Sequence, residues 1–70
     1  MMPLPLADID EEQIIRKVGG SQEQKQQLAD MGFVPGGAVT MVSTIGGNVI
    51  VKVKESRVAI SREMAQKIMV

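Results

Sequence analysis

Cysteine and histidine are both missing from this chain of 70 residues. Without cysteine there is no disulfide and no thiolate metal ligand, and without histidine the commonest transition-metal ligand and the usual general base are absent. The serines of the chain, Ser21, Ser43, Ser56 and Ser61, therefore have no imidazole to activate them as nucleophiles. The composition predicts a protein that is not an enzyme and carries no cofactor and no resident metal.

The chain also has few aromatic residues and no net charge. Phe33 is the only aromatic residue, and 8 basic residues balance 8 acidic ones. Proteins that bind single-stranded nucleic acid or polyproline peptides use several aromatic side chains, and nucleic-acid binders carry clustered positive charge. We therefore expect no nucleic-acid partner.

Long hydrophobic runs are absent as well. No apolar stretch approaches the roughly 18 residues that a membrane span needs. The segment Met1–Asp10 has neither the basic region nor the apolar stretch of a signal peptide. We expect a cytoplasmic protein with no direct membrane insertion.

The sequence does contain enough apolar surface for one small core. Hydrophobic residues make up 44% of the chain, and 70 residues are the length of a single small domain. No linker, internal repeat or low-complexity segment divides the chain. The sequence predicts one domain over residues 1–70.

One helix is predicted from signals at both of its ends. Ser21-Gln22-Glu23-Gln24 has the Ser-x-x-Gln pattern of a capping box, and Gln22–Met31 contains neither glycine nor proline. Gly32 stands where a glycine in the left-handed conformation closes a helix in a Schellman motif. That motif would place Phe33 over Leu28, at the end of a helix of about three turns.

A chain reversal is predicted immediately after this helix. Pro35 fixes φ at the first central position of a turn, and Gly36 tolerates φ > 0 at the second. We interpret Leu28, Met31 and Phe33 as core residues that hold the helix end against a sheet. The whole segment is interpreted as scaffold rather than as a binding site.

The remaining pattern predicts mainly β structure. Ala38–Ile45 and Val49–Lys54 are rich in β-branched residues and flank Gly46-Gly47-Asn48, which predicts a hairpin. The other predicted features are an extended entry anchored by Leu4, Leu6 and Ile9, short strands over Gln13–Val18, Arg57–Ile60 and Ile68–Val70, a turn at Glu55-Ser56, and a helical turn over Arg62–Lys67 capped by Ser61. Antiparallel strands in so short a chain avoid exposed edges by curling. We therefore expect a small β-barrel of about five strands with one helix and a short helical turn.

Two groups of residues carry atoms that metals bind. Asp8, Asp10, Glu11 and Glu12 form the only acidic cluster, but they lack the ligand spacing of a calcium loop, and a solvated rim is the preferred interpretation. Met31, Met41, Met64 and Met69 fall at predicted core or interface positions, where gap-filling explains them better than soft-metal binding.

A candidate partner surface lies on the predicted hairpin. If its valines face the core, alternation with period two turns Ile50, Lys52 and Lys54 outward together. Arg57 begins the next predicted strand and can join the same face. These four residues are the predicted partner-binding residues and suit an acidic partner; a merely solvated strand face is the alternative.

Taken together, these segments resemble the ferrous iron transport protein A (FeoA) family. The family pattern of an LxxMGFxPG helix end, a hairpin, an RxAL-like strand and a final AxxIxV is similar to Leu28–Gly36, Val39–Val53, Arg57–Ile60 and Ala65–Val70. The opening PLADI is similar as well. The resemblance covers nearly the whole chain and implies an SH3-like barrel with an inserted helix.

In function, the resemblance implies a cytosolic accessory protein of bacterial Fe(II) uptake, in a family associated with transition metal ions. Its partner would be the cytoplasmic part of the ferrous iron permease, which includes a GTPase domain. The runner-up is a small-barrel protein-interaction module of a metal-dependent regulatory system. Weak self-association, and whether the protein activates or inhibits transport, are left open.

Overall fold

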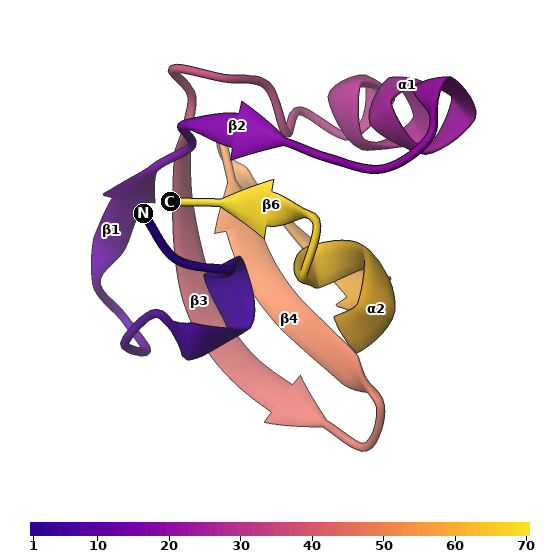
Figure 1. Ribbon diagram of the computed structural model, residues 1–70. Coiled ribbons are helices and arrows are strands. Elements are labelled where there is room, and N and C mark those ends of the chain that lie inside the picture. The colour runs from indigo at the N-terminus through magenta and orange to yellow at the C-terminus, as the bar shows by residue number, and fades with distance from the viewer.

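The computed structural model describes residues 1–70 and confirms the mainly β fold class with an early helix and a late helical turn (Figure 1). In chain order the elements are the 3-10 turn η1 (Leu4–Leu6), β1 (Glu12–Ile14), β2 (Lys17–Val18), α1 (Gln22–Asp30), β3 (Ala38–Ile45), β4 (Asn48–Val53), β5 (Ser56–Ser61), α2 (Arg62–Ala65) and β6 (Ile68–Met69).

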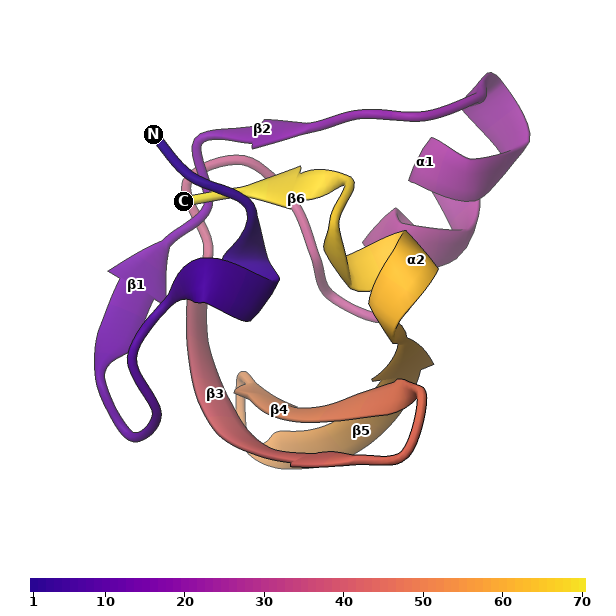
Figure 2. The ribbon, with the colours of Figure 1, turned by 60° about the horizontal axis from the view of Figure 1, so that its bottom comes forward.

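The strands form two antiparallel sheets. The 4-stranded sheet has the order β1-β3-β4-β5, and the 2-stranded sheet pairs β2 with β6. Figure 2 shows the strongly curved large sheet opposite the small one, with both helices along the same side. The curvature agrees with the predicted curling, and a bulge in β3 between Met41 and Ser43 contributes to it.

The two ends of the chain meet beside the small sheet (Figure 1). Met2 and Val70 exchange two backbone hydrogen bonds, each 2.8 Å from nitrogen to oxygen. Pro3 forms an antiparallel bridge with Met69. The first residues therefore add a further paired segment along β6.

The core fills the space between the sheets. Val49, Val51 and Val53 of β4 are buried, as the predicted alternation requires. Phe33 is the largest side chain in the core and is 1% exposed. The other buried apolar residues are Leu4, Ala7, Ile15, Leu28, Val39, Met41, Ile60, Ala65, Ile68 and Val70. They come from both sheets, both helices and the entry segment, so one core serves the whole chain.

Both predicted ends of α1 are confirmed. The backbone N–H of Ser21 donates to Oε1 of Gln24 at 2.9 Å, and the N–H of Gln24 donates to Oγ of Ser21 at 3.1 Å, which is a complete capping box. Gly32 has φ of 103° and follows the C-cap residue Met31, so the helix itself ends at Asp30. The helix is thus closed by local backbone chemistry at each end.

The predicted entry segment and first strand are partly wrong. Leu4 is fully buried, but η1 rotates the chain, so Ala7 is buried while Leu6 and Ile9 are exposed. The single strand predicted over Gln13–Val18 is two strands in different sheets. Ile15 is buried at the crossing, where its N–H donates to Gly37 at 2.8 Å. This crossing raises the strand number from the expected five or so to six.

Smaller differences concern the turns. The β3–β4 loop is Gly46-Gly47, because Asn48 already pairs with Ile45. The β4–β5 turn is Lys54-Glu55, because Ser56 pairs with Val53 as the first residue of β5. Both hairpins therefore have the two-residue loops that suit the twist of antiparallel strands.

Candidate interaction surface

The outer face of β4 and β5 brings three of the four predicted partner-binding residues together. Lys52 lies directly opposite Arg57 in the β4–β5 register, and Ile50 lies opposite Ala59. Lys52 and Arg57 are exposed, whereas Ile50 is half-buried. Directly opposed residues in an antiparallel pair have their Cβ atoms about 5 Å apart. The sheet therefore presents two adjacent cations beside one partly covered apolar side chain.

Lys54 is placed differently from the prediction. It lies in the turn after β4 with φ of 56°, in the left-handed region, so it leaves the alternation of the strand. Its methylenes pass the helix end, since a Cβ on Gly32 would lie 3.6 Å from Cε of Lys54. Lys54 therefore belongs to the border of the surface, and its stem covers the end of α1.

An acidic residue shares this face, which the sequence did not reveal. Glu12 of β1 pairs with Thr40 of β3, and Thr40 pairs with Lys52 of β4. A shallow hollow of about 250 Å³ is lined by Glu12, Ala38, Thr40, Lys52 and Lys54. The negative charge of Glu12 therefore partly neutralises the positive charge on the β1 side of the face. Arg57, on the β5 side, is the cation farthest from it. We call Ile50, Lys52, Arg57 and Ala59 the outer β4–β5 face.

The helix-end residues divide into buried and exposed groups. Leu28 and Phe33 are buried, and Gly32 is packed so closely that a Cβ there would lie 3.2 Å from Cγ2 of Val53. Pro35 and Gly36 are exposed and form the predicted turn, in which Gly36 has φ of 88°. The placement of these residues suits a scaffold that fixes the helix to the sheet.

Met31 departs from its predicted core position. It is 37% exposed and lines a groove of about 430 Å³ between α1, β5 and α2. Leu28, Ala59, Ile60 and Met64 provide the rest of its apolar lining, and Gln27, Asp30 and Ser61 are its polar members. Met31 is the C-cap residue, three positions beyond Leu28, which is the only buried residue of the helix. We call this space the α1–β5 groove.

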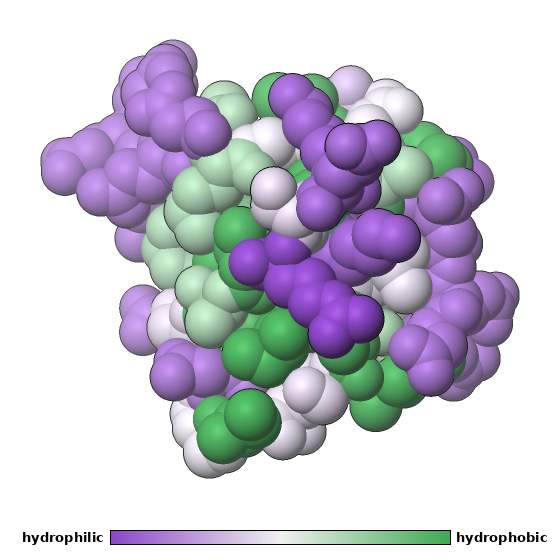
Figure 3. Space-filling model, turned by 180° about the vertical axis from the view of Figure 1, so that it is seen from behind, coloured by the Kyte–Doolittle hydropathy of each residue, from purple (hydrophilic) through white to green (hydrophobic).

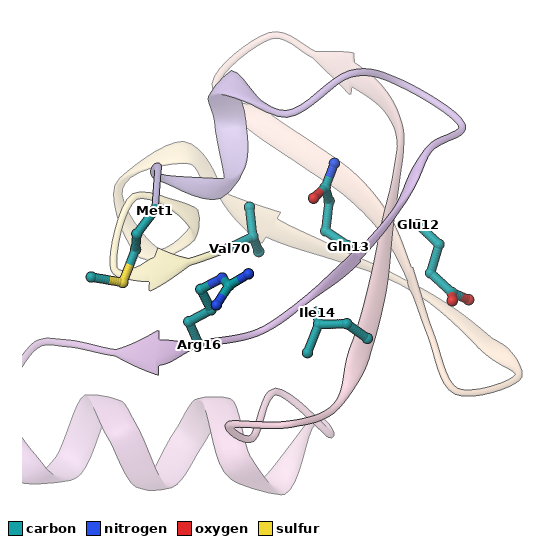
Figure 4. A pocket seen from close by; sticks show the side chains of 6 residues that line it. All are labelled: Met1, Glu12, Gln13, Ile14, Arg16 and Val70. Carbon is teal, nitrogen blue, oxygen red and sulfur yellow. The ribbon is translucent and has the colours of Figure 1, made fainter.

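A second hollow lies beside the chain ends, lined by Met1, Glu12, Gln13, Ile14, Arg16 and Val70 (Figure 4). Figure 4 shows Met1 and Glu12 at its opposite ends, with Arg16 and Val70 between them. Ile14 is 50% exposed here. The lining mixes single charges of both signs with isolated apolar groups, so it offers no concentrated recognition chemistry.

The acidic cluster does not assemble into a metal site. Asp8, Asp10, Glu11 and Glu12 are all exposed, and no three carboxylates of the chain converge on one point. Asp10 has φ of 67° and donates its backbone N–H to Met41 at 2.8 Å. Asp8, Asp10 and Glu11 lie in the polar loop between η1 and β1, and Glu12 is the first residue of β1. As for membrane insertion, neither α1 nor α2 has the length and apolar composition that a membrane-spanning helix needs.

Comparison with known proteins places the chain in a family. A family model described as the FeoA domain matches residues 2–70. The chain belongs to the FeoA family. A Methanocaldococcus jannaschii protein named as a candidate Fe(2+) transport protein A is 37% identical to this FeoA-family chain over 70 residues, which are 100% of this chain and 85% of that protein.

A solved structure agrees with the architecture. A crystal structure described as the iron uptake regulatory protein FeoA matches with a TM-score of 0.86, covering 96% of this chain and 91% of that chain. The two sequences are 24% identical, so the match concerns the fold alone. It confirms the small SH3-like β fold for this member of the FeoA family.

Sequence reasoning missed two features of the surface. Glu12 joins the cationic face through the pairing of β1 with β3, which links residues far apart in the sequence. The α1–β5 groove depends on the packing of two helices beside one strand. The only local signal for the groove was a methionine on each helix segment, Met31 and Met64, and methionine is frequent at adaptable binding surfaces.

Proposed function

We propose that this protein is a non-enzymatic accessory factor of ferrous iron uptake that docks on the cytoplasmic part of the Fe(II) permease with its GTPase domain. Membership in the FeoA family over residues 2–70 carries the proposal. The proposal is also supported by the similarity to a protein named for Fe(2+) transport, which extends over 100% of this chain.

The outer β4–β5 face supports docking on an acidic partner. Lys52 and Arg57 are exposed and directly opposed, and Ile50 adds an apolar contact beside them. Charges at the rim of an interface raise the association rate and make it salt-dependent. This face would steer the protein to its partner and fix its orientation there.

A binding role rather than a catalytic one agrees with the chemistry of the chain. The hydroxyl oxygens of Ser21 and Ser61 accept hydrogen bonds that cap α1 and α2, from the N–H groups of Gln24 and Met64. No histidine is present to serve as a base for the remaining serines. The protein would act on transport by changing the behaviour of the permease's GTPase.

Two measurements test the proposal. The purified permease cytoplasmic part should retain this protein in a pull-down, and a strain without it should take up radiolabelled Fe(II) abnormally until the gene is restored. The protein alone should hydrolyse no GTP, since it has no phosphate-binding loop. Normal uptake in the deletion strain, together with failure to bind the permease, would refute the proposal. Binding to a metal-dependent regulator instead would favour the runner-up function.

A further inference from the structure

Strand β5 forms one edge of the large sheet, and half of its backbone groups point away from that sheet. Val53 and Ser56 are the closing pair of the two-residue β4–β5 turn, which makes them a hydrogen-bonded pair. Hydrogen-bonded and non-hydrogen-bonded pairs alternate along an antiparallel ladder. Arg57 and Ala59 therefore direct both their N–H and C=O groups outward. Ser61 directs its N–H outward, whereas its C=O belongs to α2, of which Ser61 is the N-cap.

A hydrogen bond just beyond the end of β5 supports this assignment. The N–H of Arg62 donates to the carbonyl of Gly47 at 2.9 Å, one pair beyond Asn48–Ser61. Gly47 and Arg62 are thus a hydrogen-bonded pair, which makes the neighbouring pair Asn48–Ser61 a non-hydrogen-bonded one. Counting pairs from the Val53–Ser56 turn gives the same result. No backbone hydrogen bond outside the helices and strands reaches Arg57, Ala59 or Ser61. The outer edge of β5 is therefore unpaired at Arg57 and Ala59, and the N–H of Ser61 extends it.

The edge is accessible at the three residues whose N–H groups point outward. Arg57, Ala59 and Ser61 are all exposed, and Ala59 at the centre has the smallest side chain of the strand. Native sheets usually protect an edge with proline, an inward-pointing charge, a bulge or a covering segment. β5 contains no proline and no bulge, and Arg57 is its only charge.

The two sides of this edge differ in chemistry. Arg57 lies on the outer face next to Lys52, so that side is cationic. On the inner side the edge borders the α1–β5 groove, whose lining includes Ile60, Met31 and Met64. Seen from behind, the surface has hydrophobic and hydrophilic side chains in adjacent zones (Figure 3). Successive side chains of a strand added here would point to opposite sides, one toward Lys52 and Arg57 and the next toward the α1–β5 groove.

We propose that the outer edge of β5 accepts an extended segment of a protein partner as an additional strand, and that this segment alternates acidic with apolar residues. Its backbone would pair with Arg57, Ala59 and Ser61, its acidic side chains would face Lys52 and Arg57, and its apolar side chains would enter the α1–β5 groove. In such strand addition the main-chain hydrogen bonds supply affinity and the alternate side chains supply specificity. The inference rests on the proposed function only in naming the partner as the permease.

A second copy of this chain fits the edge less well. Pairing β5 with another β5 would bring Lys52 and Arg57 of both copies onto one face without any acidic residue between them. The acidic segment around Asp10 cannot serve, because the N–H of Asp10 already donates to Met41 in its own sheet. Charge complementarity therefore favours an acidic segment of a different protein.

Proline substitution at Ala59 tests the backbone role directly. Proline removes the outward N–H, and an edge strand tolerates proline where that N–H faces solvent. Ala59→Pro should stay folded, because the ladder with β4 does not use this N–H. Ala59→Val is the matched control, because it keeps the N–H and adds side-chain volume at the same position. Circular dichroism melts of both variants establish that they are folded.

The probe is a synthetic peptide in which glutamate and valine alternate. It has the same length as β5, which is six residues. Fluorescence anisotropy should show saturable binding to the wild-type protein. A peptide of the same composition with its glutamates in one block should bind weakly. Ala59→Pro should weaken binding of the alternating peptide by about tenfold or more, while Ala59→Val should retain it.

Amide exchange followed by nuclear magnetic resonance gives a readout that side-chain docking would not move. Bound peptide should slow hydrogen exchange at the amides of Arg57, Ala59 and Ser61 together. Equal binding by wild type and a folded Ala59→Pro variant, or no protection of these amides, would overturn the inference. So would concentration-dependent dimerisation that protects them without peptide. If the permease still retains Ala59→Pro in a pull-down, strand addition fails while the proposed function stands.

Discussion

The backbone N–H of Phe33 donates to the carbonyl of Leu28 across the end of α1, at 2.9 Å from nitrogen to oxygen. Together with the 2.9 Å bond from Gly32 to Ala29, this makes a Schellman motif. Leu28 and Phe33, which the first of these hydrogen bonds joins, are also both buried in the core. One local motif therefore ends the helix and attaches it to the sheet.

The first prediction concerns Gly32. Its φ of 103° strains any L-residue, and an added Cβ would lie 3.2 Å from Val53. Gly32→Ala should therefore lower the free energy of unfolding by about 1–2 kcal/mol, measured by urea denaturation. Gly32→Asn should cost less backbone strain, since asparagine tolerates this conformation better.

Two other glycines separate strain from contact. Gly36 has φ of 88° but nothing within 4 Å of an added Cβ, so Gly36→Ala should cost strain alone. Gly47 has an ordinary φ and equally open surroundings, so Gly47→Ala should be nearly neutral. Equal stability of all three alanine variants would contradict the helix-end assignment.

The second prediction contrasts Leu28 with Met31 on the same helix end. Leu28 is 0% exposed, so Leu28→Ala should leave a cavity and cost about 2–5 kcal/mol of unfolding free energy. Met31 faces the α1–β5 groove, so Met31→Ala should cost less than about 1 kcal/mol. Urea denaturation of the two variants under identical conditions gives the comparison. Similar losses from both would mean that Met31 is a core residue in solution.

These contrasts show which parts of the structure local sequence determines. The capping box at Ser21, the turn at Gly36 and the valine alternation of β4 each depend on residues within a few positions of one another, and all were predicted. Because the rules that govern them are local, the helix and the main hairpin could be placed from the sequence with few errors.

The errors arose where distant segments meet. Nothing near Ile15 in the sequence states that the chain crosses there from one sheet to the other. The sequence predicts a core position for Met31, because the spacing of apolar residues does not say where the packed part of the helix ends. Glu12 entered the candidate surface only through its pairing across β3. Each of these facts depends on tertiary pairing, which no local pattern encodes.

The third prediction concerns metal binding. Fe(II) and Zn(II) prefer nitrogen or sulfur ligands, and carboxylates alone make a poor site for them. Because no three carboxylates converge in this structure, anaerobic calorimetry should detect at most weak binding of either metal. A stoichiometric site of submicromolar affinity would contradict this expectation. Its loss on replacing Asp8 and Asp10 by asparagine would place it in the acidic cluster.

The last prediction tests the outer β4–β5 face by charge reversal. Lys52→Glu combined with Arg57→Glu changes two directly opposed, exposed residues. The melting temperature should stay nearly unchanged, because exposed charges contribute little to stability. Association with the permease's cytoplasmic part should slow, because interface charges chiefly set the association rate. Surface plasmon resonance measures that rate directly.

The salt dependence and a matched variant make this test specific. The loss of association rate should be largest at low ionic strength and shrink as screening grows. Lys17→Glu with Lys25→Glu makes the same change in net charge at exposed positions in β2 and α1, and should slow association much less. Equal slowing by both double variants would mean that overall charge, rather than this face, steers the encounter. An unchanged rate in the Lys52 and Arg57 variant at every salt concentration would reduce the face to a solvated surface.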